Sequence, residues 1–276
     1  MKTLNKEQMK IAEETLKQFL IKSQQAYGCL FLINRGQADC MEVIVDQWPD
    51  FNVLFIRSKC QEQGDLFRDV SVFTKDEASL RNILENTGFF DWKNYFCLSV
   101  NTCHEEMLKA VAAAKGVPEN KLTVCHMMTL PDPSNLTNNR VSVQLSSLKE
   151  SHIDVVNSTW KFAAEFSKQM IRNMIMNFPS SCVLDPDGHP VAWVLTYTSC
   201  AMGMLYTQPE HRRKGYAKAV VTALAKKLHS EGYPVFCFIE EENQLSYRLF
   251  TSLGFTEDPT YRVAWYGFNQ KHPIPH

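Results

Sequence analysis

The chain has 276 residues, of which 45% are hydrophobic and 21% are charged, as in an ordinary globular protein with enough apolar material for a sizeable core. Its 29 Lys and Arg residues against 30 Asp and Glu residues leave a net charge of −1, which argues against a nucleic-acid binder, since such proteins carry a clear basic excess or stripe. No run approaches about 18 apolar residues, and Glu7, Glu13 and Glu14 interrupt the N-terminal pattern, so we expect neither a transmembrane segment nor a signal peptide.

The first half of the chain predicts a mixture of helices and strands. Apolar residues at near-helical spacing predict an amphipathic helix over residues 5–23. Apolar runs bounded by turn-forming residues predict strands over residues 28–34, 41–45, 53–57 and 95–100. Helical patterns predict two more helices, over residues 76–86 and 105–115, the second ended by Gly116.

A proline-containing segment follows, at residues 131–140, and it also holds several turn-forming residues. We interpret it as a linker, which predicts an N-terminal domain over residues 1–130 and a C-terminal domain over residues 141–270.

The second half of the chain also predicts an α/β fold. We expect strands over residues 141–145, 181–184, 190–197, 202–207, 235–239 and 262–268, and helices over residues 153–159, 166–177, 215–230 and 243–253. A short polar turn at residues 185–188 predicts that the strands on either side of it form an antiparallel hairpin.

The nine cysteines do not form a recognisable metal or redox motif. No Cys-x-x-Cys pair occurs, so we expect no zinc ribbon and no other metal site. Most of the cysteines sit in apolar runs, which favours unpaired core cysteines in a reducing compartment over disulfides.

A basic, glycine-containing turn at residues 208–215 is the most informative segment. A predicted strand leads into Arg212, Arg213, Lys214 and Gly215, and a predicted helix begins directly afterwards. The N–H groups of a helix's first turn attract phosphate, and glycine lets the backbone approach a ligand. The other interpretation is a solvated basic turn before a surface helix.

The pattern Arg212-x-x-Gly215-x-Ala217 resembles the acyl-coenzyme A pyrophosphate loop of the GCN5-related N-acetyltransferase superfamily. A second resemblance follows at the expected distance, from Asn243 through a predicted helix to Leu253, Gly254 and Phe255. Together these resemblances imply a mixed sheet that is splayed to admit the pantetheine arm of acyl-coenzyme A (acyl-CoA).

A narrower resemblance covers nearly the whole chain. Short segments at residues 34–36, 45–51, 157–160, 178–180, 190–193 and 209–212 resemble the glycine N-acyltransferases, and the "-like" branch of that family most of all. The resemblance implies transfer of an acyl group from acyl-CoA to the amino group of glycine or another amino acid. It also implies that the α/β N-terminal half is a degenerate copy of the C-terminal fold, and it suggests a mitochondrial location, with the cytoplasm and the endoplasmic reticulum surface as alternatives.

The resemblance assigns cofactor-binding positions around the basic turn and the following motif: Tyr206, Thr207, Arg212, Arg213, Lys214, Gly215, Tyr216, Ala217 and Asn243. It also assigns a catalytic glutamate to a position that is Ala201 in this chain, and alanine carries out no acid–base chemistry. Glu240, at the end of a predicted strand, is the substitute base, although the alternative is a solvated member of the acidic run 240–242. Phe250 stands where many superfamily members have a tyrosine that acts as general acid.

Three functions follow as hypotheses. The first is an acyl-CoA:amino acid N-acyltransferase with glycine as acceptor, acyl-CoA as co-substrate and no tightly bound cofactor. The second, motivated by Ala201 and Phe250, is a catalytically weak acyl-CoA-binding regulator. The third is an N-acetyltransferase with another amine acceptor, which would share the basic turn. Acyl chain length and oligomeric state are open at this point.

Overall fold

The computed structural model describes residues 1–61, 64–65, 68–136, 143–164 and 166–269. The chain forms two compact units: Met1–Met127 together with the segment from Asp258 onward, and Met128–Glu257. The division into residues 1–130, a linker and residues 141–270 stays a prediction, and residues 137–142 lie outside the described residues.

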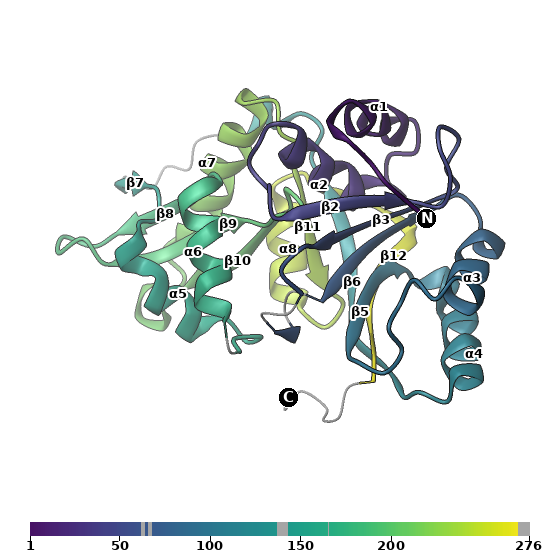
Figure 1. Ribbon diagram of the computed structural model, residues 1–276. Helices are drawn as coiled ribbons and strands as arrows, with labels where there is room; N and C mark the ends of the chain where they lie inside the picture. Colours follow the sequence, from purple (N-terminus) through teal and green to yellow (C-terminus); the bar gives the residue numbers. More distant parts are fainter. Residues whose placement is uncertain (62–63, 66–67, 137–142, 165, 270–276) are drawn as a thin grey trace. The chain divides into compact units, whose positions relative to one another are not determined.

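The first unit combines a sheet with four helices (Figure 1). Its helices are α1 (Lys6–Lys17), α2 (Gln24–Asn34), α3 (Glu77–Asn86) and α4 (Glu105–Lys115). Its strands, which include nearly all of β6 and β12, are β1 (Lys2–Thr3), β2 (Met41–Val45), β3 (Val53–Ser58), β4 (Asp69–Thr74), β5 (Phe96–Asn101), β6 (Glu119–Thr129) and β12 (Thr256–Phe268). The strands lie in the order β1-β2-β3-β4-β5-β12-β6.

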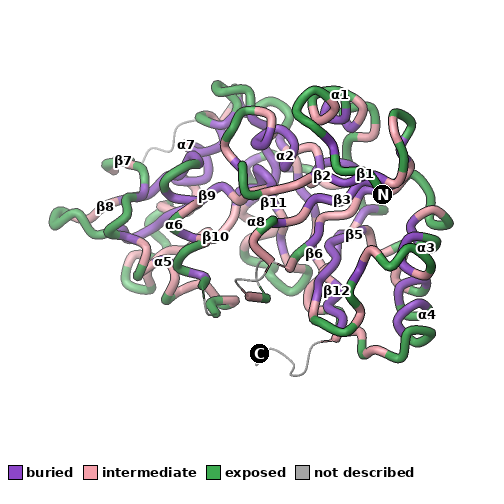
Figure 2. Tube along the Cα trace, in the orientation of Figure 1, coloured by how far each residue is buried: buried purple, intermediate pink, exposed green. Residues whose placement is uncertain are grey.

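The core of the first unit lies between this sheet and the helices α3 and α4. Leu80 and Leu108 from the helices pack with Phe55, Leu98 and Tyr266 from the strands, and all five residues are buried. Both helices alternate between buried and exposed positions along their length, as one-sided helices do (Figure 2).

The second unit contains α5 (Ile153–Thr159), α6 (Ser167–Asn177), α7 (Tyr216–Ser230) and α8 (Gln244–Ser252). Its strands are β7 (Leu145–Ser146), β8 (Ser181–Leu184), β9 (Pro190–Thr196), β10 (Met202–Thr207) and β11 (Phe236–Glu240), and they lie in the order β11-β10-β9-β8-β7. The predicted hairpin is confirmed, because β8 and β9 pair antiparallel. Helix α7 packs against β8, β9 and β10 through its apolar side.

The same order of elements occurs twice along the chain. Strand, two helices, three strands, helix, strand, helix and strand run from β1 to β6, and again from β7 to β12. The pairing repeats as well: the first four strands of each series pair antiparallel in sequence, and the fourth and fifth pair parallel. This repetition supports the prediction that the N-terminal half is a degenerate copy of the C-terminal fold.

One predicted element of the first half is wrong. Residues 28–34 were expected to form a strand, but they belong to helix α2. Nearly all of α2 is buried, including Leu30, Phe31 and Leu32 in succession. A helix that is apolar all round shows no 3.6-residue periodicity, so a short apolar run of this kind cannot be distinguished from a buried strand by its pattern.

The remaining differences concern helix ends, the strand expected over 141–145 and three further strands, of which β1 has two residues. Residues 141–142 lie outside the described residues, residues 143–144 lie outside any strand, and β7 is Leu145–Ser146. The helix predicted over 5–23 ends at Lys17, and Ile21 has a positive φ of 79° that interrupts any continuation. Strands β4 and β6 were not predicted, because both carry several polar or half-exposed residues. None of the nine cysteines, all of which lie among the described residues, forms a disulfide, and six of them are buried. Among the described residues no helix combines the length and hydropathy needed to cross a bilayer.

Candidate functional site

The candidate site lies in the second unit, at the carboxyl ends of two parallel strands. Strands β10 and β11 run parallel, so Thr207 and Glu240, their last residues, lie at the same end of the two strands. Ligands of open α/β sheets bind outside the carboxyl ends of such strands. The basic turn follows the carboxyl end of β10, and α8 begins just after the carboxyl end of β11.

The two strands separate soon after they begin. Among the described residues, β10 and β11 share one register pair, Met202 with Cys237. Strand β10 is also irregular on its other side, because its register against β9 shifts between Gly203 and Tyr206 and Met204 has a φ of 50°. The expected splayed sheet is therefore present at β10, where the ladder is interrupted on both sides of the strand.

The basic turn carries two residues in the left-handed region. Arg213 has a φ of 62° and Gly215 a φ of 81°, whereas Lys214 between them has a negative φ. Successive backbone N–H groups in alternating conformations form a concave anion-binding nest. A non-glycine residue in this region costs about 1–2 kcal/mol, so the conformation at Arg213 is held by the surrounding turn.

Helix α7 begins directly after the basic turn. Gly215 is the N-cap residue, no side chain caps the helix, and its first turn contains no acidic residue. The helix dipole and the orphan N–H groups therefore favour an anion at this end. Tyr216 and Ala217 supply the first turn, and the ring of His211 stacks on Tyr216 with a centroid distance of 6.2 Å.

Arg212 ties the basic turn to the end of β10. Its Nε donates to the Thr207 carbonyl oxygen at 3.2 Å, and its guanidinium carbon lies 5.8 Å from the centroid of the Tyr206 ring. Tyr206 stacks in turn on the buried ring of Trp193, with a centroid distance of 5.3 Å. Arg212 thus positions the turn, while Arg213 and Lys214 present exposed cations beside it.

Thr207, one of the predicted cofactor-binding residues, has a buried hydroxyl. Its Oγ1 atom is buried and has no hydrogen-bond partner among the described residues. A buried hydroxyl without a partner is unfavourable, so such groups in native structures are usually satisfied by a ligand or an ordered water.

The catalytic positions are less complete than the cofactor positions. Ala201 is fully buried and its carbonyl oxygen accepts from the Tyr197 N–H at 2.8 Å, so the position assigned to a glutamate contributes packing and a backbone bond. The Glu240 carboxylate accepts a hydrogen bond from Lys161, and its side chain is 21% exposed. The structure therefore places Glu240 at the same end of the parallel strands as Thr207, where its carboxylate forms an ion pair with Lys161.

Among the described residues, Asn243 and Phe250 of the second motif, which runs from Asn243 to Phe255, have structural roles. Asn243 caps α8, because its Oδ1 accepts from the Ser246 N–H at 3.1 Å. Phe250 is buried and packs against Phe255 with a ring centroid distance of 5.0 Å, so it belongs to the core. Tyr247, one turn before Phe250, does not take the place of the tyrosine that Phe250 replaces, since its hydroxyl donates to Glu257 Oε1 at 2.7 Å.

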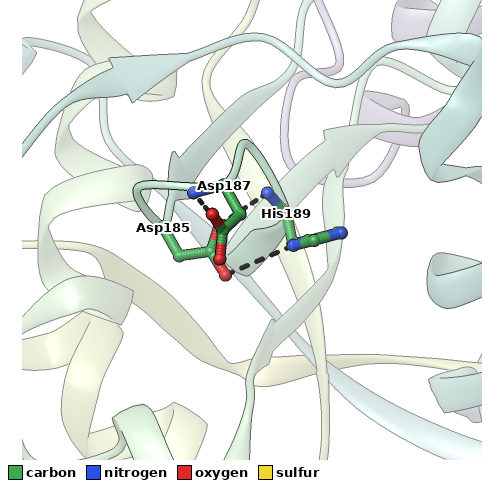
Figure 3. A group of neighbouring side chains, drawn as sticks. All are labelled: Asp185, Asp187 and His189. Carbon is green, nitrogen blue, oxygen red and sulfur yellow. Dashed lines mark hydrogen bonds and ion pairs between the residues drawn. The ribbon is translucent and has the colours of Figure 1, made fainter.

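Two acidic residues and a histidine gather at the tip of the β8–β9 hairpin (Figure 3). Asp185 Oδ1 accepts from the N–H groups of Asp187 at 3.0 Å and of His189 at 2.8 Å, and the bond from His189 contributes most to lowering the pKa of Asp185. Asp187 and His189 are exposed, Asp185 is half-buried, and all three belong to the turn, so turn geometry accounts for the cluster.

The fold and the basic turn define this protein as an N-acyltransferase of the GCN5-related type. A family model described as aralkyl acyl-CoA:amino acid N-acyltransferase matches residues 1–179, and an FR47-like model matches residues 186–263. The chain therefore belongs to the aralkyl acyl-CoA:amino acid N-acyltransferase family.

Similar proteins extend over nearly the same length. The chain is 28% identical to a rat (Rattus norvegicus) glycine N-acyltransferase over 93% of this chain and 95% of the rat protein. A solved structure of a Drosophila protein matches with a TM-score of 0.82 at 17% identity, covering 99% of both chains. A GCN5-related N-acetyltransferase from Kribbella flavida matches with a TM-score of 0.60 at 12% identity, covering 91% of this chain and 98% of that chain.

Proposed function

We propose that this protein transfers an acyl group from acyl-CoA to the amino group of glycine, giving an N-acylglycine and CoA. The observation that carries the proposal is the start of α7 behind the basic turn, where Gly215 is left-handed, no side chain caps the helix and the first turn holds no acidic residue. Membership of an acyl-CoA:amino acid N-acyltransferase family supports the reaction, and the rat glycine N-acyltransferase supports glycine as acceptor.

The proposed binding residues divide into two groups. The N–H groups of Gly215, Tyr216 and Ala217 receive the pyrophosphate, with Arg213 and Lys214 adding positive charge beside it. Tyr206 and Thr207 lie at the end of β10, next to the proposed pyrophosphate position, and Asn243 caps α8. Acyl-CoA is a co-substrate in this scheme, and no tightly bound cofactor is needed because the thioester is already activated.

The chemistry is a direct acyl transfer. The neutral amine nitrogen attacks the thioester carbonyl carbon, the C–S bond breaks, the amine loses a proton, and the thiolate of CoA leaves. Backbone N–H groups of the irregular part of β10, between Gly203 and Tyr206, are the proposed donors to the oxyanion. Holding both substrates together lowers the barrier by roughly 7–11 kcal/mol at best.

Glu240 is the proposed base, acting on the amine directly or through a water molecule. A base positioned in this way contributes about 100-fold or more to the rate. We expect Glu240→Gln to lower kcat by about 100-fold without changing KM for acyl-CoA, in a steady-state assay. Glu242→Gln, in the same acidic run but exposed, is the matched control and should retain activity. Equal activity of Glu240→Gln and wild type would show that another group accepts the proton.

The reaction itself is tested by thiol titration of released CoA, with glycine and a panel of short, aromatic and long-chain acyl-CoA donors. Glycine-dependent release supports the transferase. Acyl-CoA binding without release for any amino acid would instead support the regulator, which the alanine at 201 and the buried Phe250 motivate. Release with other amines but not amino acids would support the third hypothesis.

The location is a separate proposal. The resemblance to glycine N-acyltransferases supports a mitochondrial location. Fractionation of cells expressing the tagged full chain would test this location against the cytoplasm and the endoplasmic reticulum surface.

A further inference from the structure

The connection between β9 and β10 holds a tyrosine beside the position of the absent glutamate. The Cys200 N–H donates to the Tyr197 carbonyl oxygen at 2.9 Å, and the Tyr197 N–H donates to the Ala201 carbonyl oxygen at 2.8 Å. Cys200 has a φ of 67°, as in a type I turn followed by a left-handed residue. Tyr197 and Ala201 therefore close this tight turn as neighbours.

The ring of Tyr197 lies against the backbone of Gly203. Gly203 pairs directly with Leu195, and Tyr197, two residues further on, has its side chain on the same side as Leu195. A Cβ atom placed on Gly203 would lie 2.0 Å from Cε2 and 2.7 Å from Cδ2 of the Tyr197 ring. The ring thus occupies the space that a side chain at position 203 would fill.

This contact lies where β10 separates from β11 and where its pairing with β9 becomes irregular. Gly203 directly follows Met202, which pairs with Cys237 of β11, and the register against β9 shifts between Gly203 and Tyr206. The reaction proposed above places the thioester carbonyl along this part of β10. The half-exposed Tyr197 ring therefore borders the acyl end of the substrate.

We propose that the Tyr197 ring is a wall of the acyl-binding space and determines which acyl groups the protein accepts. This role rests on the proposed function. It requires glycine at position 203, because any side chain there would displace the ring. It depends on the ring and not on the tyrosine hydroxyl.

A purely structural role makes a different prediction. An aromatic ring laid over a glycine in a sheet also shields the backbone and stabilises the strand. Removing a ring with only this role lowers Tm and weakens all acyl-CoA donors equally. Removing a wall changes the ratio between small and bulky donors.

The experiment compares full-length wild type with Tyr197→Ala, Tyr197→Phe, Gly203→Ala and the Tyr197→Ala/Gly203→Ala double variant. Kd and kcat/KM are measured for acetyl-CoA and for phenylacetyl-CoA, and Tm is recorded for each variant. We expect Tyr197→Ala to shift the ratio about tenfold toward phenylacetyl-CoA, the size of discrimination that a pocket wall provides. Tyr197→Phe should keep the wild-type ratio.

Gly203→Ala supplies the second arm, because its Cβ displaces the ring while Tyr197 remains. We expect it to change the donor ratio in the wild-type background and to have no further effect on the ratio in the Tyr197→Ala background. Tyr27→Ala, in the first unit, controls for loss of an aromatic side chain elsewhere and should leave the ratio unchanged.

Equal weakening of both donors in Tyr197→Ala, with only Tm reduced, overturns the proposal. If wild type binds acyl-CoA without turnover, the ratio of Kd values alone decides the role of Tyr197. Wild type that binds neither donor overturns the proposed function and this inference together, and the wild-type titration shows this before any variant is made.

Discussion

The two repeated halves differ most clearly at the connection between their fourth strand and the next helix. In the first half, residues 75–76 join β4 to α3, and Asp76 caps the helix, with its Oδ1 accepting from the Ser79 N–H at 2.7 Å. In the second half, residues 208–215 join β10 to α7, and no side chain caps the helix. The start of α3 is satisfied by the chain's own carboxylate, whereas the start of α7 has no side-chain cap and is where we propose that a ligand's phosphate binds.

The strands beside these connections differ in the same sense. Strands β4 and β5 share three register pairs, from Asp69 with Cys97 to Ser71 with Ser99, whereas β10 and β11 share one. In the first half the helix start is therefore capped by a side chain, and the two parallel strands stay paired over a longer stretch. We infer that this order of elements binds acyl-CoA only where the helix has no side-chain cap and the two parallel strands separate. We therefore expect one acyl-CoA per chain.

The largest effect is expected at Gly215. Gly215→Val places a β-branched side chain at a φ of 81° and blocks close approach of the pyrophosphate to the helix start. Several charge-assisted hydrogen bonds are lost, so we expect the Kd for acyl-CoA to rise about 100-fold or more by isothermal titration.

Gly116→Val in the first unit is its matched control. Gly116 is also left-handed, with a φ of 67°, and it ends α4 with open space around it. It should lower Tm for the same backbone reason and leave the Kd unchanged. A similar rise in Kd for both variants would show that Gly215 acts through stability alone.

A smaller effect is expected from the exposed cations of the basic turn. Arg213→Gln combined with Lys214→Gln should raise the Kd for acyl-CoA about tenfold at low salt, with a smaller difference at high salt because ions screen exposed charges. Lys75→Gln, at the corresponding connection of the first half, is the control and should bind acyl-CoA as wild type does, since its Nζ lies 4.9 Å from the ring centroid of Phe51. A salt-independent result would argue that the two cations do not meet the phosphates.

The smallest effect on binding is expected at Asp76. Asp76→Ala removes the cap of α3 and should lower the free energy of unfolding by about 1 kcal/mol, measured by urea denaturation. The Kd and the stoichiometry for acyl-CoA should stay as in wild type. A second acyl-CoA bound per chain, in either protein, would contradict the inference that each chain binds one.

The sequence predicted the basic turn and the elements on either side of it better than some elements of the first half. Pro209, Gly215 and the basic residues are local signals, because they set backbone conformation and charge within a few residues. The strand expected over 28–34 was wrong because burial on all sides removes the periodicity that separates a helix from a strand. Strands β4 and β6 escaped prediction for the opposite reason, since their polar residues hide the apolar ones.

The catalytic assignments could be taken less far. The sequence shows that position 201 is alanine and that 250 is phenylalanine, so two acid–base groups that the resemblance implies are absent. It does not show that Glu240 is held by Lys161, 79 positions earlier, or that Tyr197 covers Gly203. Both contacts depend on how separate elements pack.

The amino-acid sequence by itself determined the family, the α/β class and the place of the basic turn, because each depends on local conformation, local charge or motif spacing. Only the tertiary structure decided that the splay falls between β10 and β11, that the Thr207 hydroxyl is buried without a partner among the described residues, and that β12 pairs with β5. Strand pairing and burial join residues far apart in the chain, and no local pattern records which of them will meet.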